Sequence, residues 1–208
     1  MIAIVDYGVG NLRSVQKAME HVGVTGVVTG DRGVIREAQG VILPGVGAFG
    51  DAINTLRRAG LDEVVTECIA RRVPLLGICV GMQMLFDESE ELGRHRGLGV
   101  LPGRIVRFAP GLKVPHVGWN QVYPRVTGAG RPSPLLVGIR PGDYAYFVHS
   151  YYPVPADEGI VLATTDYGVE FASAVGVDGV FGIQFHPEKS QDIGLRILKN
   201  FAEVVEQA

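Results

Sequence analysis

The stretch Val73-Pro74-Leu75-Leu76-Gly77-Ile78-Cys79-Val80-Gly81-Met82-Gln83 joins a short apolar run to helix-forming residues. Residues 73–78 predict a buried strand, and residues 80–86 predict a helix with no turn signal between the two. Cys79 therefore stands at a strand-to-helix junction with a glycine two positions away on each side, the layout of a nucleophile elbow. We expect these glycines to let the backbone turn sharply without a Cβ clash, and the helix N-terminus to favour the thiolate. A buried structural cysteine is the alternative, so the hypothesis depends on a base elsewhere in the chain.

Strand and helix patterns alternate before this stretch. Strands are predicted at Ile2–Asp6, Val24–Val28 and Gly40–Leu43, and helices from an Asn11 N-cap to about His21, over Asp31–Ala38, and over Asp51–Arg72 with a break near Gly60. This alternation predicts an α/β fold with a doubly wound, mostly parallel sheet and flanking helices. In such sheets, functional sites lie beyond the C-terminal ends of the strands.

The second half of the chain has a different pattern. Residues 87–99 are predicted to form a polar, solvated loop, and from Val100 onward short strands separated by Pro and Gly predict an antiparallel extension. Further strands are expected at 144–152, 159–164, 171–177 and 180–185, before a closing helix over about 192–205.

Composition narrows the possible functions. A chain of 208 residues, 47% of them apolar, is expected to form a single domain over residues 1–208. The net charge of −3 gives no electrostatic reason to expect a nucleic acid or an anionic membrane as partner. Two cysteines without a secretory signal indicate a reducing, cytoplasmic setting. Cys68 lies on the apolar face of its predicted helix, so we expect it to be an inert core thiol.

A histidine and a glutamate near the C-terminus complete a candidate catalytic set. His186-Pro187-Glu188 follows the apolar strand at 180–185. A cysteine nucleophile needs a histidine as base and benefits from a carboxylate that orients the imidazole. The glycine-rich segment 44–50 also follows a strand, and its backbone N–H groups could stabilise an oxyanion. These residues predict a Cys-His-Glu triad.

Two motifs carry a family resemblance. Gly77–Gln83 together with Gln184–Ser190 resembles the class I (triad) glutamine amidotransferases. Five segments are most similar to one subfamily, the glutaminase subunits of imidazole glycerol phosphate synthases: Asp6–Asn11, Pro44–Gly47, Met82–Gln83, Pro115–Asn120 and His149–Tyr152. The resemblance runs from residue 2 to about 200. Val80 stands where Leu is common, and Thr127–Ser133 matches nothing that we can interpret.

The resemblance implies a mechanism and a set of site residues. Cys79 would attack the side-chain amide of glutamine, His186 would transfer protons and Glu188 would orient His186. The remaining roles are an oxyanion hole from the backbone of Val80 and of Val46 or Gly47, and substrate binding by Gly45, Gln83, Ser150 and Tyr151. The products would be glutamate and ammonia.

The resemblance also implies a partner. In this subfamily a (β/α)8-barrel cyclase subunit receives the ammonia within a heterodimer and makes imidazole glycerol phosphate and aminoimidazole carboxamide ribonucleotide. The expected interface includes Gly10, Asn11, Trp119 and Asn120, with parts of 87–97. No cofactor and no metal site is expected, because His116 and His149 lack further ligands at metal spacing. We interpret His149 as part of the substrate strand, and His116 as structural or interfacial.

Other functions remain open from the sequence. The chain could serve another synthase, such as one making pyridoxal phosphate, or act as a stand-alone cysteine hydrolase. A different class, a non-catalytic regulatory protein on the same fold, would have no need of Cys79, His186 and Glu188 together.

Overall fold

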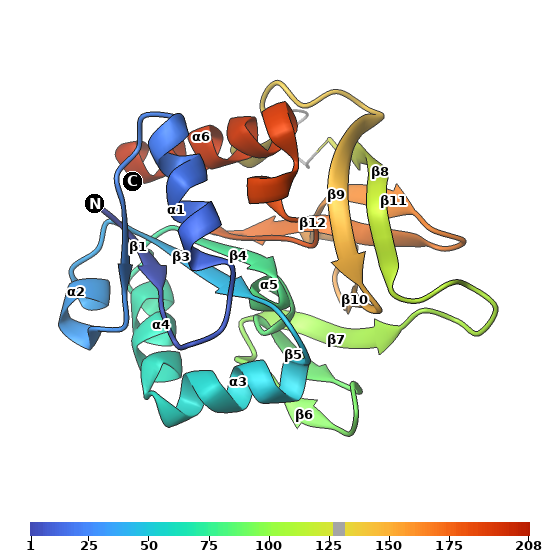
Figure 1. Cartoon of the computed structure of the whole chain (residues 1–208), viewed down its shortest axis with the longest axis horizontal. Coiled ribbons are helices and arrows are strands. Elements are labelled where there is room, and N and C mark those ends of the chain that lie inside the picture. Colours follow the sequence, from blue (N-terminus) through green and yellow to red (C-terminus); the bar gives the residue numbers. More distant parts are fainter. Residues whose placement is uncertain (127–131) are drawn as a thin grey trace.

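The computed structural model describes residues 1–126 and 132–208. The uninterpreted linker Thr127–Ser133 lies outside these ranges except for its last two residues. Figure 1 shows a central sheet flanked by helices, with the two chain ends near each other on the left of the view. None of the described helices combines the length and the apolar character needed to cross a membrane.

The main sheet contains nine strands within the described ranges, in the order β2-β1-β3-β4-β13-β12-β11-β8-β9. The first five are parallel: β2 (Gly26–Thr29), β1 (Ile2–Val5), β3 (Gly40–Gly45), β4 (Leu75–Cys79) and β13 (Val180–Ile183). The other four continue as an antiparallel extension: β12 (Glu170–Val177), β11 (Val161–Asp166), β8 (His116–Pro124) and β9 (Asp143–His149). The predicted fold class is confirmed.

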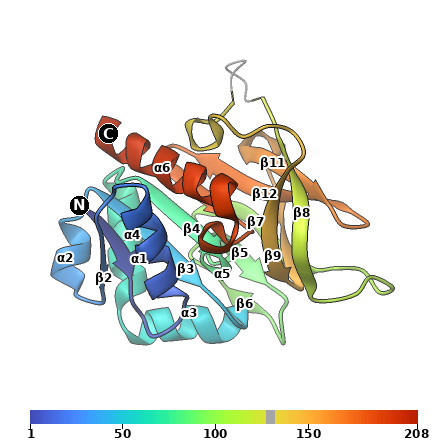
Figure 2. The same cartoon turned by 45° about the horizontal axis from the view of Figure 1, so that its top comes forward.

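Helices cover both faces of the parallel strands. They are α1 (Leu12–His21), α2 (Arg32–Arg36), α3 (Phe49–Arg58), α4 (Leu61–Ala70), α5 (Val80–Gln83) and α6 (Gln191–Gln207), with short 3₁₀ turns η1 (Pro134–Leu136), η2 (Glu158–Ile160) and η3 (Pro187–Lys189). Figures 1 and 2 show α1 and α6 on one face and α3 and α4 on the other. This is the doubly wound arrangement that the alternation of patterns predicts.

A second, four-stranded sheet corrects the expectation of a polar loop over 87–99. Its order is β10-β7-β5-β6, formed by β10 (Tyr151–Pro155), β7 (Leu101–Arg107), β5 (Phe86–Ser89) and β6 (His95–Arg96). β5 buries only its end residues, and its charged middle is held by local contacts: the Asp87 carboxylate accepts from the Gly103 N–H (2.8 Å), and Glu88 pairs with Arg94 (2.8 Å). With only its end residues buried, β5 is too short to show a recognisable alternation of apolar and polar residues, so the segment reads as a loop.

Two predicted elements have different limits. The helix expected over 80–86 ends at Gln83 after one turn, because the chain enters β5 at Phe86. The strand expected over 144–152 divides at Ser150, where the chain leaves the main sheet for the second one.

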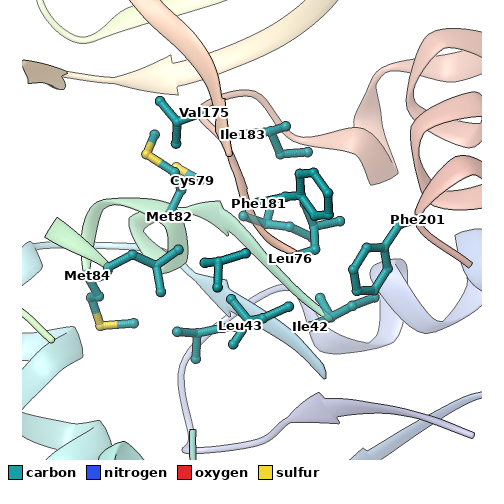
Figure 3. Close-up of a cluster of buried hydrophobic side chains, with 14 of the residues drawn as sticks. Ile42, Leu43, Leu76, Cys79, Met82, Met84, Val175, Phe181, Ile183 and Phe201 are labelled. Carbon is teal, nitrogen blue, oxygen red and sulfur yellow. The ribbon is translucent and has the colours of Figure 1, made fainter. Parts of the chain in front are cut away.

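The core of the parallel half consists of buried apolar side chains from adjacent strands and from the helices that cover them. Figure 3 shows part of it, with Ile42 and Leu76 of the central strands, Phe201 of α6 and Met82 of α5. Burying an aliphatic or aromatic side chain stabilises the fold by roughly 1.5–3 kcal/mol. The core therefore fixes β3, β4 and β13 relative to one another, and the functional residues follow these strands.

Candidate active site

Three segments meet at the C-terminal edge of the parallel strands. Gly45 at the end of β3 pairs in register with Cys79 at the end of β4, and Ile183 of β13 pairs with Ile78. The loop after β3, the cysteine and His186 consequently lie around one cavity of about 270 Å³. The sequence predicts this edge as the site, and the structure brings these segments together there.

Cys79 has a backbone conformation that non-glycine residues rarely adopt. Its φ is 54° and its ψ is −113°, at the junction of β4 and α5. Such strain is typical of functional positions, and here it turns the side chain into the cavity. The thiol lies 3.9 Å from the Val148 carbonyl oxygen, and the Gln184 side-chain amide donates to the sulfur at 3.7 Å.

The neighbouring glycines avoid Cβ clashes at this turn, as expected, although neither has the strained backbone conformation itself. Gly77 and Gly81 both lie outside the left-handed region, so the sharp turn is made by Cys79 itself. A Cβ at Gly77 would lie 2.7 Å from the Met82 Cα, and one at Gly81 would overlap the Leu43 carbonyl oxygen. The glycines are needed because α5 packs directly on the strands. The helix that follows Cys79, α5, is a single turn, shorter than the helix expected over residues 80–86.

Gly45 contributes to the same packing. A Cβ there would lie 2.6 Å from the Gly81 backbone nitrogen, and Gly45 is not among the residues that line the cavity. Its absent side chain lets β3 approach α5, which differs from the predicted contact with substrate.

His186 is held by backbone contacts and by Glu188. The His186 N–H donates to the Tyr146 carbonyl (2.9 Å), and the Ser190 hydroxyl donates to the His186 carbonyl (2.6 Å). Nδ1 of the imidazole lies 3.0 Å from the Glu188 Oε1, and both side chains are at most 5% exposed. Burial lowers the pKa of His186, but hydrogen bonds with Cys79 and Glu188 and the negative charges of both outweigh it, raising the pKa to about 10. The site therefore favours an imidazolium beside the sulfur.

Glu188 has a second partner that the sequence does not reveal. Burial raises the pKa of Glu188, but the hydrogen bond and positive charge of His186 and a hydrogen bond from Asn11 more than compensate and lower it. Asn11 stands at the predicted N-cap position of α1, yet its side chain makes no capping bond; its amide donates to the Glu188 Oε1 at 3.2 Å. Asn11 therefore helps to hold Glu188 in its ionised form.

Most of the other predicted site residues line the cavity. Besides Cys79 and His186, these are Val46, Gly47, Val80, Gln83, Ser150 and Tyr151. Four further lining residues were absent from the predicted catalytic and binding set: Glu91, Val148, His149 and Lys189. Of these, His149 was expected only as part of the substrate strand.

Glu91 and Tyr7 brace the loop after β3. The Glu91 Oε2 accepts from the Phe49 N–H at 2.6 Å, where α3 begins, and the carboxylate also borders the cavity. The buried Tyr7 hydroxyl donates to the Pro44 carbonyl at 2.7 Å. Burial, with a smaller effect from the charge of Cys79, raises the pKa of Tyr7, so it stays a neutral donor. Neither role has a local sequence signal.

The predicted interface residues include the partly exposed Trp119. Trp119 on β8 is 46% exposed and packs edge-on against Tyr146, with ring centroids 5.8 Å apart. Lys189, which lines the cavity, places its ammonium 5.8 Å from the Tyr146 ring centre. Gly10 adopts a φ of 128° in the turn before Asn11. These aromatic and charged groups connect Trp119 to the cavity rim.

The second cysteine is remote from the cavity. Cys68 is fully buried on α4, and its thiol donates to the Ile35 carbonyl at 3.5 Å. Burial raises the pKa of Cys68, so the thiol form is favoured. The prediction of an inert core thiol agrees with this environment.

The chain is similar to known proteins over nearly all of its length. A family model described as class-I glutamine amidotransferase matches residues 3–205. The chain is 54% identical over 208 residues to the imidazole glycerol phosphate synthase subunit HisH of Moorella thermoacetica, covering 100% of this chain and 96% of that protein. It is 51% identical over 212 residues to the subunit of the same name from Syntrophotalea carbinolica, covering 98% and 100% respectively.

Solved structures share the fold at low sequence identity. One described as a glutamine amidotransferase has a TM-score of 0.76 at 20% identity, covering 99% of this chain and 98% of the other. The structure of PurLQS from Thermotoga maritima has a TM-score of 0.75 at 19% identity, covering 98% and 97%.

Proposed function

This chain belongs to the class-I glutamine amidotransferase family, and from that premise we propose that Cys79, His186 and Glu188 hydrolyse glutamine within one glutaminase domain spanning residues 1–208. The chain is the glutaminase subunit of an imidazole glycerol phosphate synthase. The observation that carries the proposed residue roles is the strained Cys79 at the strand end beside a buried His186–Glu188 pair (3.0 Å).

The chemistry proceeds in two steps. The Cys79 thiolate attacks the side-chain amide carbon of glutamine, and the His186 imidazolium donates its proton to the departing nitrogen, which leaves as ammonia. The resulting thioester is then hydrolysed: neutral His186 accepts a proton from water, the hydroxide adds to the carbonyl, and glutamate leaves as the Cys79 sulfur is released. Glu188 keeps the imidazole oriented and stabilises its charged form.

Both steps pass through an oxyanion next to the Cys79 sulfur. We assign its stabilisation to the N–H of Val80 and to an N–H of the Val46–Gly47 loop, since all three residues line the cavity beside Cys79. Losing one such donor typically lowers the rate by about 10²–10³-fold. Tyr7 and Glu91 support this loop from its two ends.

The far end of glutamine carries an ammonium and a carboxylate. Glu91 offers a carboxylate at the cavity wall that can pair with the ammonium, and Ser150 and Tyr151 line the same cavity. Gln83 acts less directly than the sequence predicts, because its Nε2 hydrogens already bind the Tyr151 carbonyl and the Gln184 side chain, each at 3.0 Å. It fixes the Tyr151 wall against which glutamine binds.

The proposal includes a cyclase partner that consumes the ammonia in a heterodimer. Free ammonia protonates at neutral pH and loses its nucleophilicity, so transfer must avoid solvent. The proposed docking surface contains Gly10, Asn11, Trp119 and Asn120; Trp119 borders a hollow of about 470 Å³. A cytoplasmic setting, also proposed, would keep the two free thiols reduced.

The test uses the chain assembled with its cyclase. Cys79→Ala should abolish synthesis from glutamine but leave synthesis from added ammonium salts, because the partner carries out the cyclisation. Cys68→Ala is the matched control and should keep both activities. If Cys79→Ala retains glutamine-dependent synthesis, the nucleophile is a different residue. Full glutaminase activity of the isolated chain would instead indicate a hydrolase independent of a partner.

A further inference from the structure

Two buried histidines outside the proposed triad lie in contact with each other. His116 on β8 and His149 at the end of β9 are paired on adjacent antiparallel strands, and His116 Nδ1 lies 3.0 Å from His149 Nε2. His116 is stacked between the rings of Tyr167 (4.0 Å) and Phe147 (5.1 Å). His149 reaches the active-site cavity, whereas His116 contacts Asn120, so the pair connects the cavity wall to the proposed docking surface.

The contact with Asn120 shows which ring nitrogen of His116 carries the hydrogen. The Asn120 Oδ1 accepts from the Gln121 N–H (2.8 Å), and its Nδ2 donates to the Asp166 carbonyl (2.8 Å). These two backbone partners fix the orientation of the amide. The same Nδ2 lies 3.3 Å from His116 Nε2, which must therefore be an acceptor. A neutral His116 then carries its hydrogen on Nδ1 and donates it to His149.

The contact between His149 and the Tyr151 carbonyl independently gives the same direction for the hydrogen bond between the two rings. His149 Nδ1 lies 2.9 Å from the Tyr151 carbonyl oxygen, which can only accept. His149 therefore carries its hydrogen on Nδ1 and leaves Nε2 free to accept from His116. Burial lowers the pKa of His116 to about 4; for His149, burial, with smaller effects from the charges of His116 and His186, outweighs the Tyr151 hydrogen bond and lowers the pKa to about 3. Both rings are thus neutral, with the Nδ1–H form favoured in each.

The chain of hydrogen bonds continues to the nucleophile. The Tyr151 carbonyl accepts a second hydrogen bond, from Gln83 Nε2 at 3.0 Å. Gln83 also donates to the Gln184 Oε1 (3.0 Å), and Gln184 Nε2 donates to the Cys79 sulfur (3.7 Å). The two branches meet at one carbonyl oxygen, so a displacement of His149 would also disturb the groups that orient Cys79 and the substrate wall.

We propose that His116 and His149 are positioning residues for glutamine hydrolysis: as a hydrogen-bonded pair of fixed polarity, they hold the Tyr151 carbonyl, and through it Gln83 and Gln184, in register with Cys79. The inference rests on the proposed glutaminase function and adds residues to the same site. The pair does not serve as a proton relay, because His149 donates to the Tyr151 backbone carbonyl, which has no proton to exchange.

A matched pair of substitutions separates positioning from packing. In His116→Asn, the side-chain nitrogen can take the place of Nδ1 and still donate to His149. In His116→Gln, the side-chain oxygen can take the place of Nε2 and accept from Asn120, but His149 loses its donor. Both variants remove the ring from between Tyr167 and Phe147, so a packing role alone predicts equal effects.

We expect His116→Gln to lower kcat for glutamine hydrolysis in the complex about tenfold or more, and His116→Asn to stay within about threefold of wild type. Alkylation of Cys79 by iodoacetamide should be slower in His116→Gln than in His116→Asn. Mass spectrometry of the peptide that contains Cys79 measures the rate. Synthesis from ammonium salts by the same complexes is the control and should not change.

A spectroscopic measurement on the wild-type chain keeps the proposal testable if a variant fails to fold. The ¹⁵N chemical shifts of the imidazoles should show His116 and His149 as neutral Nδ1–H tautomers at pH 7. Nε2–H tautomers, or equal activity of the two variants in an active complex, would overturn the positioning role. A wild-type complex that does not hydrolyse glutamine, or an unreactive Cys79, would instead overturn the proposed function.

Discussion

His186 and His149 are both buried, 4% and 6% exposed, yet their environments favour opposite charges. The pKa of His186 is raised to about 10, whereas that of His149 is lowered to about 3. Burial disfavours the imidazolium in both cases. The difference comes from the partners: His186 lies against Cys79 and the Glu188 carboxylate, while His149 has a neutral histidine and a carbonyl. Burial alone therefore does not decide whether a histidine is charged.

The two environments suit two tasks. An imidazolium beside a sulfur can donate a proton to a leaving group, and it becomes a base once that proton is given away. A neutral imidazole in a dry aromatic surrounding keeps one tautomer and holds its neighbours in fixed positions. The first lies at the end of the parallel strands and the second in the antiparallel extension, where β8 and β9 pair (Figure 2).

The largest effect that tests this contrast is expected from His186→Ala. We expect the rate of glutamine hydrolysis in the complex to fall by about 10²–10⁴-fold, because proton transfer and the charged partner of Cys79 are both lost. Glutamate release is the measurement, and ammonium-dependent synthesis should be unchanged. His21→Ala, at the exposed end of α1, is the control. A fall of less than tenfold would place the acid–base group elsewhere.

A smaller loss is expected from Glu188→Gln, of about 10- to 10²-fold. The amide preserves a hydrogen-bond partner for His186 but removes the negative charge that helps to raise its pKa. The imidazolium should then lose its proton at a lower pH, which the pH dependence of Cys79 alkylation would detect. If the rate falls as far as in His186→Ala, Glu188 does more than orient the base.

The last expected effect concerns stability in acid rather than catalysis. His116 and His149 are neutral when folded but have a pKa near 6.5 when unfolded, so the unfolded chain binds more protons as the pH falls below about 6.5. The free energy of unfolding should therefore decrease as the pH falls from 6.5 to 5, by up to about 1.4 kcal/mol per pH unit for each histidine.

Urea denaturation at several pH values measures this slope. His149→Phe should reduce the slope of the unfolding free energy with pH by the contribution of one histidine, up to about 1.4 kcal/mol per pH unit. The variant also loses two hydrogen bonds, so we expect it to be less stable at every pH. Glu188 does not interfere, since an unfolded glutamate remains mostly ionised above pH 5. Parallel curves for wild type and variant would show that His149 is not buried as a neutral ring.

Several features were predictable because their signals are local. The apolar run before Cys79 and the glycines around it predict a strand end and a tightly packed turn, and His186-Pro187-Glu188 follows another strand end. Parallel strands bring such ends to one edge. The expected lack of room for a Cβ is confirmed at both glycines, but the group that Gly81 would meet, the Leu43 carbonyl of β3, belongs to a distant segment and had no local signal.

Other features had no local signal. Asn11 contacts Glu188 across 177 positions of sequence, and Glu91 contacts Phe49 across 42. The loop reading of 87–99 failed because β5 has only its end residues buried, which is too little for an alternating pattern to be recognised. Likewise, nothing in the segments around His116 and His149 indicates that the two rings meet.

The sequence by itself therefore determined which residues stand at the strand ends, because strand patterns and steric limits act over a few neighbouring residues. It placed a cysteine, a histidine and a glutamate where a doubly wound sheet exposes its functional edge. Only the tertiary structure decided the protonation of the three buried histidines, His116, His149 and His186. A pKa depends on burial and on charges within a few ångströms, and those groups come from segments far apart in the chain.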